Sequence, residues 1–135
     1  MKIIIATDDA TPVVERVARR VRERGHEATV LPKGTWGPVA TEAARRVASG
    51  EFDQAVVFCW TGTGVSIAAN KVRGVRAALC TDAPSAAGAR KWNDANVLAL
   101  SLRLLSEPLA AEIVDAWLDA TYEGTEGESL ALLDR

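Results

Sequence analysis

The amino-acid sequence predicts a single α/β domain: a doubly wound, Rossmann-like, five-stranded parallel sheet with helices on both of its faces. Two observations support this fold class. Short apolar segments rich in β-branched residues alternate with amphipathic segments along the whole chain, which is the pattern of right-handed βαβ units. The 135 residues are also a usual size for one domain, and they contain no internal repeat, linker or low-complexity tract.

Five segments have strand character, because each is short, apolar and followed by turn-forming residues. They comprise residues 2–6, 27–31, 54–59, 76–80 and 97–101. The first of them, KIIIA, is almost purely apolar, which is typical of a parallel strand that is covered on both faces.

Helical segments separate these strands. Thr11 and Pro12 open the first helix and Gly25 ends it, as expected of capping residues. The other predicted helices comprise residues 39–48, 64–72, 85–91 and 108–122. We therefore expect the domain to span residues 1–124, and residues 125–135 to form a C-terminal tail that can hold a short helix.

Composition excludes several classes of function. The net charge is −2, from 16 basic and 18 acidic residues, so there is no electrostatic case for nucleic acid as a partner. No apolar run approaches the roughly 20 residues that cross a bilayer, and we expect a cytoplasmic protein that does not bind membranes. One histidine and two separated cysteines, Cys59 and Cys80, favour reduced thiols and no bound metal. No cofactor is expected.

Chemically useful side chains follow three of the predicted strands. In parallel sheets, ligands bind beyond the carboxyl ends of the strands. Asp8-Asp9, the 59–64 segment and Thr81-Asp82 should therefore share one crevice.

The 59–64 segment, CWTGTG, carries the clearest chemical signal. Its glycines let backbone N–H groups turn toward an anion, and the helix that follows adds partial positive charge. A helix N-terminus also lowers the pKa of a nearby thiol, which suits Cys59 to act as a nucleophile or base. The alternative is that Cys59 simply fills space in the core, as most buried cysteines do.

Residues 59–71, CWTGTGVSIAANK, closely resemble the loop C-G-T-G-x-G-x-S-I-A-A-N-K of the ribose-5-phosphate isomerase B and galactose-6-phosphate isomerase family. Shorter matches follow in the expected order. They comprise residues 33–36, 76–80, 93–100, 113–118 and 122–124. The chain thus resembles a divergent member of this family.

The resemblance implies an aldose–ketose isomerase that works through an enediolate without metal or cofactor. It assigns Cys59 as the base, with Thr61 and Asp8 as further catalytic residues. By position, Gly62 and Gly64 match the anion loop, and Asn93 and Arg103 match substrate and phosphate contacts. It also implies a homodimer or dimer of dimers in which two subunits share each site.

Departures from the family pattern fall at the substrate site. Asp9 replaces a phosphate-binding histidine, Trp92 replaces the ring-opening histidine, and Trp60 replaces a glycine. Glu126 and Leu130 stand where two arginines bind the phosphate. Asp9, Trp60 and Trp92 are therefore expected to line a modified substrate site, which indicates a substrate other than ribose 5-phosphate.

Three hypotheses remain open at this point. The chain can be an isomerase with a less anionic or more apolar substrate. It can be a non-catalytic relative that binds a metabolite or fills its own pocket. It can also be one subunit of a hetero-oligomer, since galactose-6-phosphate isomerases are built from two unlike subunits.

Overall fold

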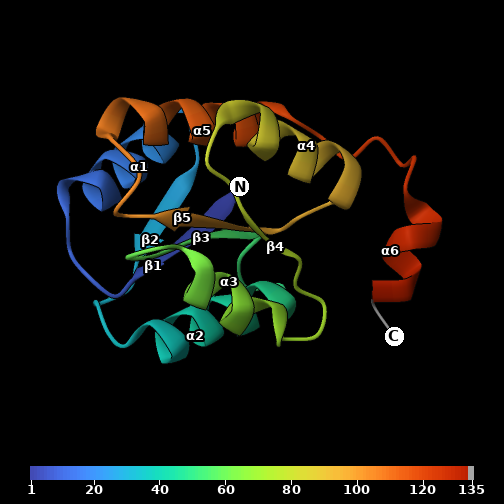
Figure 1. The fold of residues 1–135 in the computed structure, drawn as a ribbon, viewed down its shortest axis with the longest axis horizontal. Helices are drawn as coiled ribbons and strands as arrows, with labels where there is room; N and C mark the ends of the chain where they lie inside the picture. Colours follow the sequence, from blue (N-terminus) through green and yellow to red (C-terminus); the bar gives the residue numbers. More distant parts are fainter. Residues whose placement is uncertain (134–135) are drawn as a thin grey trace.

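The computed structural model describes residues 1–133 and contains one five-stranded parallel sheet (Figure 1). The strand order is β2-β1-β3-β5-β4, and every pair of neighbours is parallel. The strands are β1 (Lys2–Thr7), β2 (Glu27–Val30), β3 (Gln54–Cys59), β4 (Ala77–Leu79) and β5 (Val97–Ser101). The predicted fold class is confirmed.

Helices cover both faces of the sheet (Figure 1). On one face lie α1 (Pro12–Glu23), α4 (Ala83–Asn93) and α5 (Glu107–Asp119). On the other lie α2 (Trp36–Ala48) and α3 (Thr63–Asn70). In residues 1–133, no helix is both long and apolar enough to cross a membrane.

The apolar strands contribute side chains to two hydrophobic cores, one on each side of the sheet. Successive side chains of a strand point to opposite faces. Accordingly Ile3 and Ile5 enter the core under α1, α4 and α5, whereas Ile4 and Ala6 enter the core under α2 and α3. All six residues of β3 are buried, because this strand lies in the middle of the sheet.

Two helices are longer than the sequence pattern predicts. Helix α2 begins at Trp36, three residues before the predicted start. Helix α4 begins earlier than predicted because the Asp82 carboxylate accepts the Ser85 N–H (2.8 Å) and caps it. It also extends to Asn93, so that Trp92 lies in a helix rather than in the loop that we expected.

The C-terminal segment leaves the body of the domain after α5. The Glu123 N–H donates to the Lys91 carbonyl (2.9 Å), which fixes the segment against the end of α4. It ends in α6 (Gly127–Leu133), which stands to one side of the layered domain (Figure 1). Leu130 is buried, whereas Leu132 and Leu133 are exposed.

One buried hydrogen bond joins α5 to the start of the central strand. The indole N–H of Trp117 donates to the Gln54 side-chain carbonyl at 2.8 Å, and both residues are buried. A buried carbonyl that loses its donor costs more than the bond contributes when it is made.

We therefore expect Trp117→Phe to lower the free energy of unfolding by about 2–3 kcal/mol, from the lost donor and the smaller ring. Adding Gln54→Leu should restore about 1 kcal/mol, because the unpaired carbonyl disappears. Urea unfolding followed by circular dichroism measures both values. A double variant less stable than Trp117→Phe would contradict the role of this hydrogen bond.

Candidate active site

Three neighbouring strands end side by side at one edge of the sheet. Thr7 of β1 is in register with Phe58 of β3, and Cys59 is in register with Ser101 of β5. Neighbouring strands lie about 4.8 Å apart. The segments that begin at Asp8, Trp60 and Leu102 therefore leave the sheet next to one another.

The start of the Cys59 loop is fixed by the end of β5. The Leu102 N–H donates to the Cys59 carbonyl at 3.0 Å. The Trp60 carbonyl accepts two hydrogen bonds, one from the Ser101 hydroxyl (3.0 Å) and one from the Arg103 N–H (2.9 Å). Sequence reasoning missed Ser101, whose buried hydroxyl gives no signal beyond its place at a strand end.

The loop then turns through Gly62 into α3. Gly62 has φ +77°, and a β-carbon on it would lie 2.6 Å from Leu79 Cδ1 and 3.0 Å from the Leu100 carbonyl carbon. Only glycine fits this position without strain. Gly64 lies under the indole of Trp36: a β-carbon there would be 2.8 Å from the ring atom Cε3.

The first turn of α3 presents backbone donors without a capping side chain. The first helical bond here runs from the Ser66 N–H to the Gly62 carbonyl (3.3 Å). The amides of Thr63, Gly64 and Val65 precede it, and the Gly62 N-cap supplies no acceptor side chain. Such a turn attracts an anion or a developing oxyanion.

Cys59 and Thr61, at the start of this loop, differ in their exposure to solvent. Cys59 is 5% exposed and belongs to the core under α2 and α3. Thr61 is exposed, and its hydroxyl lies 2.7 Å from that of Thr63 at the mouth of the loop.

The second cysteine, Cys80, lies on the other side of the sheet from Cys59. Cys80 belongs to the core on the opposite face of the sheet, so the two thiols do not pair, and both are free. Burial, assisted by the charge of Asp82, raises the pKa of the Cys80 thiol to about 11. Cys80 therefore remains a protonated, unreactive thiol near neutral pH.

The two carboxylates after β1 differ in their surroundings. Burial raises the pKa of the partly buried Asp8, and the neighbouring charge of Asp9 raises it further. Asp9 is exposed, and its backbone is held by Thr7: the Thr7 hydroxyl donates to the Asp9 carbonyl (2.6 Å) and accepts the Asp9 N–H (3.2 Å). The pKa of Asp8 is thus closer to neutrality than that of an ordinary aspartate, which favours a role in proton exchange.

Trp60 and Arg103 lie at the same edge of the sheet. The Trp60 side chain is 63% exposed beside the loop. Arg103 is exposed and lies in the segment after β5, where its backbone bonds to Trp60. Asp82 also lies at this edge, where it caps α4, and its hydrogen bond from Ser85 lowers the pKa of its carboxyl.

Trp92 and Asn93 lie elsewhere. Both belong to the last turn of α4, near the amino ends of the strands, and the Trp92 ring packs on Gly88 of its own helix. Trp92 therefore does not lie in a loop at the carboxyl edge of its own chain, whereas its part in lining a substrate site stays a prediction. About 17 Å, the length of the five-residue β5, separates this end of the sheet from the Cys59 end.

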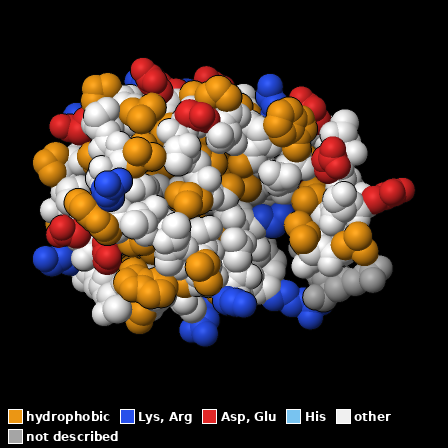
Figure 2. Space-filling model, in the orientation of Figure 1, with side chains coloured by type: hydrophobic (Ala, Val, Ile, Leu, Met, Phe, Trp, Pro, Cys, Tyr) orange, Lys and Arg blue, Asp and Glu red, His pale blue; other side chains and the backbone are white. Residues whose placement is uncertain are grey.

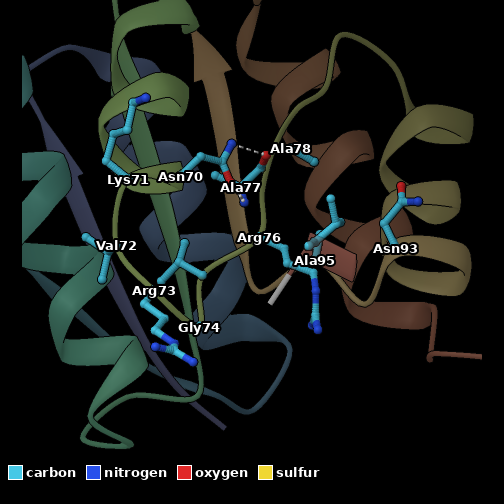
Figure 3. Close-up of a pocket in the computed structure, with 12 residues that line it drawn as sticks. Asn70, Lys71, Val72, Arg73, Gly74, Arg76, Ala77, Ala78, Asn93 and Ala95 are labelled. Atoms are coloured by element: carbon cyan, nitrogen blue, oxygen red, sulfur yellow. Dashed lines mark hydrogen bonds between the residues drawn. The ribbon is translucent and has the colours of Figure 1, made fainter. Parts of the chain in front are cut away.

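Asn93 lines a pocket of about 640 Å³ between α3, β4 and α4 (Figure 3). Lys71, Arg73 and Arg76 also line it, but Figure 3 shows their side chains pointing in different directions. Cys59 is not among the residues that line this pocket. Within residues 1–133, no group of three histidine, cysteine or acidic side chains is placed to hold a metal ion.

One chain thus brings together most of the predicted site residues. They are Asp8, Asp9, Cys59, Trp60, Thr61, Gly62, Gly64 and Arg103, all at the carboxyl edge of the sheet. Trp36, which covers Gly64, is an addition that the sequence did not suggest, because nothing in its local pattern indicates a contact with α3.

Comparison with known proteins gives a consistent result. Residues 3–131 match the family model described as Ribose/Galactose Isomerase. Ribose-5-phosphate isomerase B of Escherichia coli K12 is 48% identical over 109 residues, which cover 76% of this chain and 72% of that enzyme. A 4-deoxy-4-sulfo-D-erythrose isomerase of Clostridium sp. MSTE9 is 34% identical over 131 residues, covering 90% of this chain and 81% of the relative.

Solved structures agree with these sequence matches. The ribose-5-phosphate isomerase B of Clostridium thermocellum superimposes with a TM-score of 0.94 at 37% identity, covering 99% of this chain and 95% of that one. The chain therefore belongs to the ribose/galactose isomerase family, which comprises aldose–ketose isomerases of sugar phosphates.

Proposed function

We propose that this protein interconverts an aldose and a ketose with an anionic tail, through an enediolate, and that Cys59 is the base. The observation that carries this proposal is the position of Cys59, at the end of the central strand, next to a glycine loop whose helix offers uncapped amides. A thiol and a set of preorganised donors are what an enediolate needs.

The proposed reaction is a proton transfer between two neighbouring carbons. The Cys59 thiolate takes the proton from the hydroxyl-bearing carbon next to the carbonyl, and the electron pair of that C–H bond forms the enediolate. Amides of the 62–64 loop stabilise the negative oxygen. The thiol then returns the proton to the former carbonyl carbon, while Asp8 and Thr61 exchange protons with the two oxygens. No atom or electron is gained or lost overall.

We further propose that two copies of the chain share each site. Cys59 and Asn93 lie at opposite ends of the sheet in one chain, too far apart to contact one small sugar. A symmetric dimer can place the α4 end of one copy over the loop of the other. Exposed apolar side chains near the loop, including Trp60 and Ile67 (61% exposed), suit such an interface. Figure 2 shows other hydrophobic side chains exposed over the domain and over the C-terminal segment that ends in α6.

The substrate that we propose is shorter or less charged than ribose 5-phosphate. Asp9, at the site edge, is an exposed carboxylate, which repels a phosphate carrying nearly two negative charges. A sulfonate carries one charge and is repelled less. The Clostridium relative that is named for a sulfonated four-carbon sugar supports this choice.

A panel of the sugars named for relatives tests the substrate and the base together. It comprises ribose 5-phosphate, galactose 6-phosphate, D-erythrulose 4-phosphate and 4-deoxy-4-sulfo-D-erythrose. We expect a four-carbon sugar to give a kcat/KM at least roughly tenfold above that of ribose 5-phosphate. Cys59→Ser should then lower kcat by roughly 10³-fold, because a positioned general base contributes on that order.

Cys80→Ala is the matched control, since it removes the other thiol from the opposite face of the sheet. Its kcat should stay within about threefold of the wild-type value. Ribose 5-phosphate as the best substrate would contradict the proposed specificity. Equal kcat in Cys59→Ser and wild type would remove Cys59 as the base, and no turnover of any sugar would favour a binding protein or a subunit that needs an unlike partner.

Mixing two inactive variants tests the shared site. After subunit exchange, equal amounts of Cys59→Ser and Asn93→Ala should give heterodimers in which one of the two sites is intact. With half of the dimers mixed, about a quarter of the wild-type specific activity should return. If each site lies within one chain, mixing restores no activity, and the shared-site proposal fails.

A further inference from the structure

Two exposed apolar side chains, those of Leu79 and Trp36, pack closely against the two glycines of the 59–64 loop. Leu79, at the end of the edge strand β4, occupies the space next to Gly62. Trp36, at the start of α2, occupies the space next to Gly64: the ring atoms Cε3, Cζ3 and Cδ2 would lie 2.8–3.1 Å from a β-carbon on that glycine. The indole therefore rests directly on the backbone of the first turn of α3.

The segment that carries Trp36 is itself fixed at the active edge of the sheet. The Gly34 N–H donates to the carbonyl of Thr7 (3.3 Å), the last residue of β1. Two residues later α2 begins at Trp36. The backbone just before Trp36 is thus bonded to the end of β1, and the Trp36 ring lies against the turn that bears the uncapped amides.

The position of the ring has two physical consequences. A bulky, rigid side chain against a glycine leaves the backbone little room to move toward α2, because atoms in contact resist further approach. The ring also keeps water from one side of the Gly64 peptide, which strengthens electrostatic interactions of the neighbouring amides. Trp36 nevertheless stays 46% exposed, so its contact with Gly64 is not explained by burial in the core.

We propose that Trp36 is a positioning residue of this loop, which holds the first turn of α3, and with it the packing of α3 over Cys59, in the arrangement that the reaction requires. The inference rests on the proposed function for its kinetic part only. Its structural part, that Trp36 keeps the first turn of α3 packed over Cys59, is tested without any turnover.

The test compares Trp36→Ala, Trp36→Phe and Gly37→Ala in the full-length protein. Phenylalanine keeps an aromatic ring on Gly64. Gly37→Ala is a control in the same helix turn, because a β-carbon at Gly37 meets nothing within 4 Å. Iodoacetamide labels the cysteines, and mass spectrometry gives separate rates for Cys59 and Cys80; the melting temperature is measured in parallel.

Trp36→Ala should raise the labelling rate of Cys59 at least about fivefold, because the first turn of α3 loses its support. The labelling rate of Cys80 should not change, because Cys80 lies on the opposite face of the sheet. With a substrate from the panel, kcat should fall roughly tenfold or more while KM stays within about threefold, because the amides act mainly on the transition state. Trp36→Phe and Gly37→Ala should stay close to wild type in both assays.

Two results would overturn the inference. One is a Trp36→Ala protein with wild-type labelling of Cys59. The other is a parallel rise at Cys59 and Cys80 with a lower melting temperature, which would mean that Trp36 only contributes to overall stability. If no sugar is converted, the proposed function fails, and the ratio of the Cys59 and Cys80 rates alone decides the role of Trp36.

Discussion

Three hydrogen bonds between the ends of β3 and β5 set the geometry on which the site depends. The Cys59 carbonyl accepts the Leu102 N–H, and the Trp60 carbonyl accepts the Ser101 hydroxyl and the Arg103 N–H. They extend the pairing of two parallel strands past their last residues. The loop that follows therefore leaves the sheet in one direction, and α3 begins after Gly62 with amides that no side chain caps.

The same parallel architecture places the predicted site residues at two ends of the molecule. Side chains at strand ends, such as Cys59 and Asp8, gather at the carboxyl edge. Helix α4 runs back across the sheet and carries Asn93 to the amino edge. A site that needs both ends is completed most simply by a second copy, and the pocket that Asn93 lines in one chain then represents only a part of it.

Most of the fold could be predicted from sequence, because β-branched apolar runs and amphipathic segments differ in period. The glycine loop and Cys59 were also predictable, since their residue types carry the chemistry. The early start of α2 could not be predicted, because Trp36 is placed by a contact with Gly64 that is distant in sequence. Trp92 was placed at the wrong end of the sheet, because the connection from a helix to the next parallel strand returns to the amino ends of the strands, whatever the length of α4.

The central claim is that the Cys59 thiol moves a carbon-bound proton, and solvent exchange tests it most directly. In D2O, proton NMR follows the hydrogen next to the carbonyl of whichever ketose of the panel is converted. The wild-type protein should exchange this hydrogen for deuterium during turnover, because solvent can replace the proton on the Cys59 sulfur before that proton is returned, and Cys59→Ser should slow the exchange roughly 100-fold or more. Exchange at the wild-type rate in Cys59→Ser would contradict the account.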